Sequence, residues 1–280
     1  MISIIRQIAS QLQAVYPSDE AEALAWWIAE ETTGCTRTQL LCGCKDTTFS
    51  ADMQTIVDRL LHFEPIQYIF GHTKWCGLDL KVTPATLIPR PETAELVSQV
   101  EGVMVDGERL RVLDIGTGSG CIAVALKKRH PEWQVTGIDI SAEAIEVAKE
   151  NAKRNKVDVE FEVANIFDLN EVNFQSSIFN LKYDVVVSNP PYIREQEKAL
   201  MRRNVLDYEP ASALFVSDDD PLLFYRKIVS LHLGKRVFFE FNEVFAQEMK
   251  QLLCANGYTD VMVTNDIYGK PRIIEGRMAG

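Results

Sequence analysis

The sequence predicts an α/β protein in which a small all-helical domain precedes a mostly parallel sheet with helices on both faces. Two observations support this fold class. From about residue 93 to the end, short apolar runs typical of strands alternate with runs of helical spacing, whereas the apolar spacing of the first 70 residues is helical. A length of 280 residues suits one large and one small domain.

Residues 1–70 form the predicted N-terminal helical domain. A first helix would carry apolar side chains along one face, namely Ile4, Ile5, Ile8, Leu12 and Val15. Residues 17–19, Pro-Ser-Asp, should end this helix and cap a second one, EAEALAWWIAEE, whose Glu22 can reach back across the first turn. A third helix is expected after Ser50, with an apolar side formed by Met53, Ile56, Val57, Leu60 and Leu61.

Residues 71–92 predict a hairpin linker. Apolar side chains approach alternate spacing around Gly77, at Trp75, Leu78, Leu80 and Val82. An extended or turning backbone is then fixed by Pro84, Pro89 and Pro91. Residues 93–280 form the predicted sheet domain, with strands expected at RVLDI, QVTGIDI, VEFEVA, YDVVVSN, RVFFEF, YTDVMVT and RIIEG.

The composition argues against a membrane, a nucleic acid or a metal as partner. No apolar run approaches the roughly 18 residues of a membrane helix, and the N-terminus reads as an amphipathic helix rather than a signal peptide, so we expect a cytoplasmic protein. The net charge of -11 disfavours direct binding to a phosphate backbone. The cysteines nearest one another, Cys35, Cys42 and Cys44, have no CxxC pair or nearby histidine, so we expect no metal.

A glycine-rich turn indicates a nucleotide-like cofactor. DIGTGSG at residues 114–120 follows an apolar strand and precedes the helical run CIAVALKKRH, an arrangement that lets a ligand approach the backbone at a helix N-terminus. Asp139 ends the next strand, where a carboxylate can accept both hydroxyls of a ribose. It could instead cap the following helix, but the two roles are compatible. The pattern predicts an adenosine cofactor without saying which.

A second motif indicates the chemistry. The strand DVVVS ends in Asn189, Pro190, Pro191 and Tyr192, and the two prolines hold this turn stiffly at the carboxyl end of the sheet. The side-chain oxygen of Asn189 and the carbonyl of Pro190 can accept both N–H groups of an NH2 group, which would aim the nitrogen lone pair at the methyl group of a sulfonium donor. Tyr192 can stack on a flat amide or base. The motif therefore predicts methylation of a planar nitrogen.

With these motifs the chain resembles the HemK-type protein glutamine methyltransferases, and specifically the bacterial release factor glutamine methyltransferases. The similarity covers nearly the whole chain through EPIQYIFG, LIPRPETAELV, VLDIGTGSGCIAVAL, SNPPYI, YEPASALF, LLFYRKI and DIYGKPR. NPPY alone is shared with adenine-N6 DNA methyltransferases, whereas PRPET and the helical domain are more specific.

The resemblance implies a Rossmann-like class I methyltransferase domain with a seven-stranded sheet, joined by the hairpin to a helical domain that docks the release factor. It implies methyl transfer from S-adenosyl-L-methionine to N5 of the glutamine in a Gly-Gly-Gln motif, by a monomer that leaves S-adenosyl-L-homocysteine. The implied cofactor-binding residues are Gly116, Thr117, Gly118, Ser119, Gly120, Asp139, Asn165, Ile166 and Asn189. The substrate-binding ones are Asn189, Pro190, Pro191 and Tyr192, of which Asn189, Pro190 and Tyr192 are the expected catalytic residues.

Three residues depart from the family pattern. Asn165 replaces a usual acid at the adenine, and Pro221 and Asn242 stand where glycines are common. Three other functions also stay open: an adenine-N6 nucleic-acid methyltransferase, a glutamine methyltransferase for a ribosomal protein, and a non-catalytic sensor of S-adenosylmethionine. The intact NPPY motif argues against the sensor, and the net charge argues against the nucleic-acid enzyme.

Overall fold

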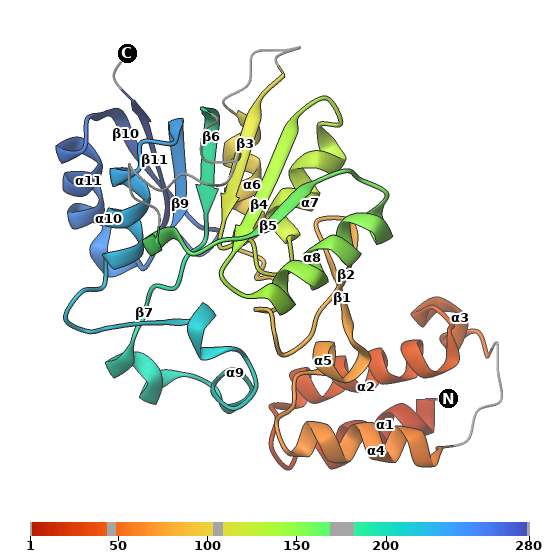
Figure 1. Ribbon diagram of the computed structural model, residues 1–280. Coiled ribbons are helices and arrows are strands. Elements are labelled where there is room, and N and C mark those ends of the chain that lie inside the picture. The colour runs from red at the N-terminus through yellow and green to blue at the C-terminus, as the bar shows by residue number, and fades with distance from the viewer. Residues whose placement is uncertain (1, 44–48, 103–108, 169–181, 279–280) are drawn as a thin grey trace. The chain divides into compact units, whose positions relative to one another are not determined.

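The computed structural model describes residues 2–43, 49–102, 109–168 and 182–278. The chain divides into two compact units (Figure 1). The helical unit consists of Met1–Phe70 together with Arg202–Tyr208, and the sheet unit consists of Gly71–Met201 and Glu209–Gly280. Among the described helices, none has the length and apolar character needed to span a bilayer.

The helical unit packs around three helices, α1 (Ile2–Leu12), α2 (Ser18–Thr33) and α4 (Ala51–Leu61). Short helices accompany them: α3 (Arg37–Leu41), α5 (Ile66–Phe70) and α9 (Arg203–Leu206). The three helices expected from the apolar spacing are confirmed, and their core includes Ile8, Leu12, Ile28, Met53, Val57 and Leu60, all nearly inaccessible to solvent. Val15 is an exception, because α1 ends at Leu12 and leaves Val15 exposed.

The expected cap of α2 is wrong. Pro17 occupies the N-cap position with a φ of -56°, and since its ring has no oxygen, no side chain caps this helix. The hydroxyl of Ser18 instead accepts a hydrogen bond from Gln13, and Glu22 accepts one from the indole of Trp26. At α4 the serine cap does form, because Ser50 Oγ accepts from the Met53 backbone N–H at 3.2 Å.

A segment far along the chain also belongs to the helical unit. The Arg203 guanidinium lies 4.5 Å from the centre of the Phe63 ring, and the Tyr208 hydroxyl donates to the His62 carbonyl at 2.9 Å. Arg202 pairs with Glu20 at 3.1 Å. Residues 202–208 therefore fold against α2 and the end of α4, a long-range association that local apolar spacing does not encode.

The sheet unit contains the predicted seven-stranded sheet. Its strands run in the order β10-β11-β9-β6-β3-β4-β5, and β9, β6, β3, β4 and β5 are mutually parallel, whereas β11 pairs antiparallel with β9 and β10. The strands are β3 (Arg111–Ile115), β4 (Gln134–Asp139), β5 (Glu160–Val163), β6 (Tyr183–Ser188), β9 (Gly234–Glu240), β10 (Tyr258–Asn265) and β11 (Pro271–Met278). The short strands β7 (Ile193–Arg194) and β8 (Phe215–Val216) pair separately.

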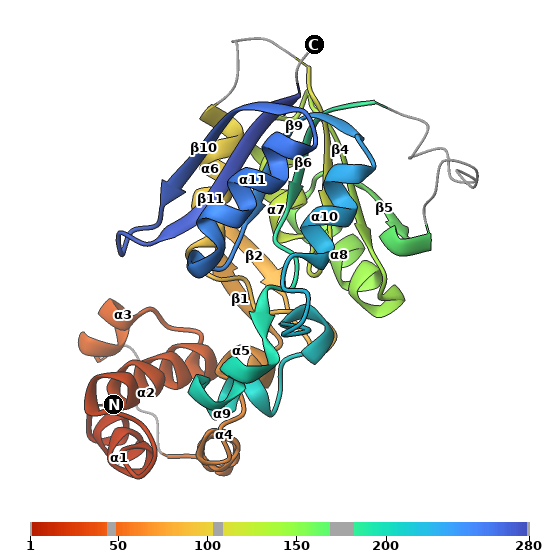
Figure 2. The same ribbon diagram turned by 90° about the vertical axis from the view of Figure 1, so that its left-hand side faces the viewer.

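Helices cover both faces of this sheet, as expected (Figures 1 and 2). Successive residues of β3 point to opposite faces, so Val112 packs toward α6–α8 and Leu113 toward α10 and α11. The first layer consists of α6 (Thr93–Gly102), α7 (Cys121–Arg129) and α8 (Ala142–Asn155), and the second of α10 (Leu223–Ser230) and α11 (Ala246–Ala255). Both faces of the central strands are buried, which explains their almost continuous apolar sequence.

The expected hairpin is present as β1 (His72–Trp75) and β2 (Leu78–Lys81), and it packs against α8. Asn151, on α8, is fully buried and makes three hydrogen bonds. Its Oδ1 accepts from the Lys81 N–H at 2.6 Å, and its Nδ2 donates to the carbonyls of Lys81 and Ser119 at 2.9 and 2.8 Å. One amide thus ties the hairpin and the glycine-rich turn to the same helix.

We predict that Asn151→Ala lowers the free energy of unfolding by roughly 2 to 4 kcal/mol, because it leaves several buried backbone groups without partners. Urea denaturation followed by circular dichroism measures the change. Asn155→Ala is the control, since this half-buried neighbour also bonds to the hairpin but water can replace its contacts. Equal losses in the two variants would contradict the assigned role of Asn151.

Candidate active site

The carboxyl ends of β3, β4 and β6 open onto one cavity of about 300 Å³. Its wall combines segments that are distant in sequence. They are the glycine-rich turn, the ends of β4 and β5, the turn after β6, the stretch from Ala85 to Thr93, and residues 210–213 with Phe224. Parallel pairing of β3 with β4 and with β6 brings these strand ends to the same edge of the sheet.

The glycine-rich turn has a backbone that other residues would strain or block. Gly118 has a φ of 55°, in the left-handed region, and the space that a Cβ would occupy is open on the cavity side. At Gly120 a side chain would be blocked by its neighbours, because a Cβ there would lie 3.0 Å from the Cβ of Ala148 on α8. Thr117 and Ser119 alternate with Gly116, Gly118 and Gly120, and both are buried and line the cavity together with Gly116.

Asp139 lines the cavity beside this turn. Its Oδ2 accepts from the Gly118 N–H and its Oδ1 from the Ser141 N–H, both at 2.9 Å. The cap of α8 is Ser141, whose hydroxyl accepts from the Ala144 N–H at 3.1 Å, so Asp139 is not needed as a cap. Burial raises the pKa of Asp139. Each carboxylate oxygen keeps a lone pair with which it can accept a ligand hydroxyl.

Asn165 and Ile166 also line the cavity, at the start of a short 3-10 helix, η1 (Ile166–Asp168). Asn165 Oδ1 accepts from the Phe167 N–H, and its Nδ2 donates to Asp168 Oδ2, both at 3.0 Å. The orientation of the Asn165 amide is therefore fixed within its own turn. Asp168, the carboxylate that accepts from this amide, is not part of the cavity wall.

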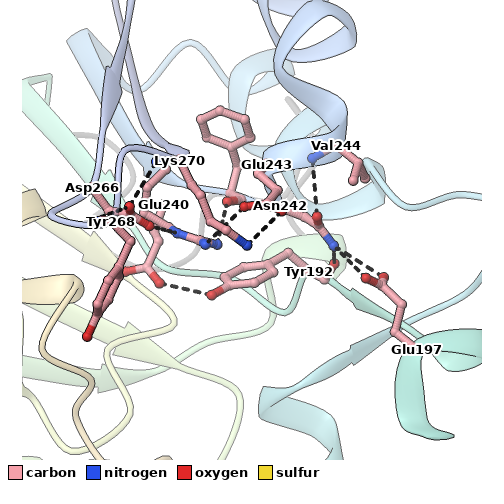
Figure 3. A network of polar contacts seen from close by, with 11 residues as sticks. Tyr192, Glu197, Glu240, Asn242, Glu243, Val244, Asp266, Tyr268 and Lys270 are labelled. Atoms are coloured by element: carbon pink, nitrogen blue, oxygen red, sulfur yellow. Dashed lines mark hydrogen bonds and ion pairs between the residues drawn. The ribbon is translucent and has the colours of Figure 1, made fainter. Parts of the chain in front are cut away.

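Only some residues of the turn after β6 line the cavity. Asn189 and Pro191 line the cavity, whereas Pro190 and Tyr192 are not part of its wall. Pro190 is buried, and the Tyr192 hydroxyl donates to Glu240 Oε1 at 3.0 Å (Figure 3). Burial and the neighbouring Glu240 both raise the pKa of Tyr192. The structure thus brings Asn189 to the cavity and directs the polar end of Tyr192 away from it.

Sequence reasoning missed two residues whose side chains bond to the turn after β6, Thr93 and Glu240. Asn189 Nδ2 donates to Thr93 Oγ1 at 3.2 Å, and the same hydroxyl donates to Glu240 Oε2 at 2.7 Å. Glu240 is only 1% exposed. A signal for it existed in the sequence, because it is the single charged residue within the apolar run VFFEF. For Thr93 the signal was its place in the PRPET segment.

An ion pair holds two walls of the cavity together. Glu209 accepts from Arg90 Nη2 at 2.6 Å and from the Ile88 N–H at 3.1 Å, and its side chain is 1% exposed. Removing one partner of such a pair leaves a buried charge without compensation. The pair therefore fixes the stretch before α6 against residues 209–213.

No group of three or more His, Cys, Asp or Glu side chains among the described residues is arranged to hold a metal ion. Cys44, one of the three neighbouring cysteines considered above, lies outside the described residues.

Comparisons with known proteins identify the family of this chain. A family model described as "Methyltransferase domain" matches residues 106–261, and one described as "PrmC N-terminal domain" matches residues 3–71. A relative from Bacteroides thetaiotaomicron, named release factor glutamine methyltransferase, is 42% identical over 98% of this chain and 99% of its own length. A second, from Flavobacterium psychrophilum, carries the same name and is 38% identical over 96% of both chains. The chain belongs to the release factor glutamine methyltransferase family.

Solved structures agree with the fold. The catalytic domain of human Mettl16, in complex with an RNA hairpin, superposes with a TM-score of 0.57 at 18% identity and covers 82% of this chain and 81% of that one. Such distant similarity indicates the fold alone. It supports a Rossmann-like fold for the sheet unit.

Two of the three departures from the family pattern have structural explanations. Pro221 is the second residue of a turn in which the Leu223 N–H donates to the Asp220 carbonyl at 3.3 Å, a position that the fixed φ of proline suits. Asn242 caps a short 3-10 helix, η5 (Glu243–Phe245), by accepting from the Val244 N–H. Its Nδ2 also donates to the Tyr192 carbonyl at 3.5 Å and to Glu197 at 3.2 Å (Figure 3). The asparagine thus anchors the turn after β6, which a glycine could not do.

The residues around the cavity fit S-adenosylmethionine. Gly116 and Gly118 leave room for its methionine end, because a Cβ at either position would meet no atom within 4 Å, and Asp139 offers acceptors to its ribose. We predict that Asp139→Ala weakens cofactor binding about ten- to a hundredfold, because charge-assisted hydrogen bonds contribute roughly 1.5 to 3 kcal/mol.

Isothermal titration calorimetry with S-adenosylmethionine checks this prediction. Glu143→Ala, which removes an exposed acid from the first turn of α8, is the matched control and should bind normally. Unchanged affinity in Asp139→Ala would mean that the carboxylate only braces Gly118 and Ser141.

Proposed function

We propose that the chain transfers a methyl group from S-adenosylmethionine to the side-chain N5 of the glutamine in the Gly-Gly-Gln motif of bacterial peptide chain release factors. Relatives named for this activity match nearly the full length of the chain. The observation that carries the proposal is the turn after β6, which presents the Asn189 amide to the cavity beside the glycine-rich turn.

The residues of this turn meet the main difficulty of the reaction. An amide nitrogen is a poor nucleophile because its lone pair is delocalised into the carbonyl, as the roughly 18 to 20 kcal/mol rotation barrier of amides shows. Asn189 donates its NH2 group to Thr93, so its Oδ1 is left to accept from the substrate. With the Pro190 carbonyl as second acceptor, both N–H groups of the glutamine are engaged and the nitrogen lone pair is directed out of the amide plane.

Bound S-adenosylmethionine supplies an electrophilic methyl group on a sulfonium. The chain needs no strong base, since the nitrogen becomes acidic only after it is methylated. The proposed catalytic residues are Asn189 and Pro190, which would contact the reacting amide, and Tyr192 in the same turn. Pro191, which lines the cavity, and Tyr192 complete the proposed substrate site, and Tyr192 contributes through the position of its ring and backbone rather than through its hydroxyl.

We further propose that the helical domain, residues 1–70, docks the release factor, that residues 71–92 act as the linker, and that residues 93–280 carry out catalysis. The match of residues 3–71 to a family-specific N-terminal domain supports this division. The glycines beside the target would let an exposed loop reach a recessed cavity, because they have no side chains to meet its rim. The proposal takes the enzyme to be a cytoplasmic monomer that does not bind nucleic acid directly.

Asn189→Ala should reduce the single-turnover rate of methyl transfer about a hundredfold or more, because a misplaced nucleophile loses most of the orientation effect. Cofactor affinity should fall much less. Rapid-quench transfer assays and calorimetry separate the two quantities. If rate and affinity fall in proportion, Asn189 chiefly builds the cofactor pocket and the proposed mechanism is wrong.

Incubation of the enzyme with a purified release factor and S-adenosylmethionine should place a methyl group on the glutamine of the Gly-Gly-Gln loop. Peptide mass spectrometry locates it. A release factor with that glutamine changed to glutamate should accept none, because it has no amide nitrogen. Methylation of DNA adenine, or of a ribosomal protein with the release factor untouched, would refute the proposed substrate.

A further inference from the structure

A chain of hydrogen bonds runs from Asn189 and Thr93, at the cavity wall, to a buried carboxylate. Asn189 Nδ2 donates to Thr93 Oγ1 at 3.2 Å, and Thr93 Oγ1 donates to Glu240 Oε2 at 2.7 Å. The other oxygen of Glu240 accepts from the Tyr192 hydroxyl at 3.0 Å. Three elements meet here: the turn after β6, the first residue of α6 and the last residue of β9.

When Glu240 is ionised, the donors and acceptors in this chain have only one consistent arrangement. An ionised carboxylate can only accept, so the Thr93 hydroxyl must give its single hydrogen to Glu240. Thr93 can then only accept from Asn189. Asn189 must therefore turn its NH2 group toward Thr93 and its oxygen toward the cavity. The direction of this amide, which electron density alone rarely decides, follows from the charge on Glu240.

We propose that Thr93 and Glu240 are positioning residues that hold the Asn189 amide with its oxygen toward the substrate nitrogen. This inference rests on the proposed function, in which that oxygen accepts from the glutamine NH2 group. In the opposite orientation the NH2 group of Asn189 would face the NH2 group of the glutamine, so two donors would meet without an acceptor. Neither residue needs to touch the reacting nitrogen, since each acts through Asn189.

The surroundings hold Glu240 in place. Arg272 lies nearby and is itself fixed, because its Nε donates to Asp266 at 3.2 Å and its Nη1 donates to the Phe241 carbonyl at 3.3 Å. The Asn242 side chain donates a hydrogen bond to the backbone carbonyl of Tyr192 (Figure 3). The Tyr225 hydroxyl donates to the backbone carbonyl of Glu240 at 2.9 Å. Carboxylate, tyrosine and turn thus form one braced network.

Burial raises the pKa of Glu240, and Glu92 raises it further, while Thr93, Tyr192 and Arg272 favour the ionised form. Tyr225 is also buried against it and stays neutral because its own pKa is raised well above the usual value. A proton on Oε2 would make Glu240 donate to Thr93, and Thr93 would then donate to Asn189 and draw the amide oxygen away from the cavity. Activity should therefore be lost as the pH falls through the pKa of Glu240.

Thr93→Val and Thr93→Ser form the test pair, because valine matches threonine in shape but has no hydroxyl, whereas serine keeps it. Thr93→Val should lower the single-turnover rate about tenfold or more, by the loss of orientation of the nucleophile. Calorimetric affinity for S-adenosylmethionine should change less than about twofold, well below the tenfold step that roughly 1.4 kcal/mol represents. Thr93→Ser should recover most of the rate.

A double-mutant cycle distinguishes positioning from a general structural effect. In the Asn189→Ala background, Thr93→Val should cause no further loss, because Thr93 acts only through Asn189. Any one of three results would overturn the proposal. They are a full rate in Thr93→Val, an additive loss in the double variant, and equal losses in the valine and serine variants.

A second readout does not depend on activity. In nitrogen-15 NMR spectra, the side-chain NH2 signals of Asn189, identified by their absence in Asn189→Ala, should exchange slowly with water in the unmodified enzyme and in Thr93→Ser. They should exchange much faster in Thr93→Val. If the enzyme leaves release factors unmethylated, the proposed function fails, but this comparison still tests the orientation. Equal exchange in all three proteins would overturn it.

Discussion

The proposed methyl transfer to a primary amide depends on acceptors that face its NH2 group, and the turn after β6 brings one of them, the Asn189 amide, to the cavity wall. The parallel register of the sheet makes this possible, because β6 lies between β3, which leads into the glycine-rich turn, and β9, which ends at Glu240. The cofactor turn, the acceptors and the buried carboxylate thus share one edge. A shift of one residue in β6 would turn Asn189 from the cavity and break its bond to Thr93.

Local features of the fold and the site could be read from the sequence. Alternating apolar runs predicted all seven strands of the main sheet, and the glycine-rich turn, Asp139 and Asn189 do line one cavity. The link from Asn189 to Thr93 and Glu240 could not be read, because these bonds join residues 96 and 147 positions apart. The direction of the Tyr192 hydroxyl depends on the same unseen carboxylate.

The path of the chain shows a feature that no sequence motif predicted. After η3 (Glu195–Leu200), which follows the turn and its short strand β7, the chain contributes residues 202–208 to the helical unit. It returns at Glu209, which secures Arg90 and Ile88 at the cavity wall. The polypeptide between two parts of the catalytic site is therefore a structural part of the unit proposed to dock the release factor. Asn242 and Glu197 brace this path where it leaves the site.

The most direct test of the central claim is how many methyl groups the loop glutamine accepts. Once methylated, the amide retains one N–H, so it can satisfy only one of the two acceptors, and its methyl group would lie against the other. Mass spectrometry of the loop peptide after prolonged incubation with excess enzyme and cofactor should therefore show a single methyl group and no dimethylated glutamine. Accumulation of the dimethylated form would contradict an alignment of the amide by Asn189 and Pro190 together.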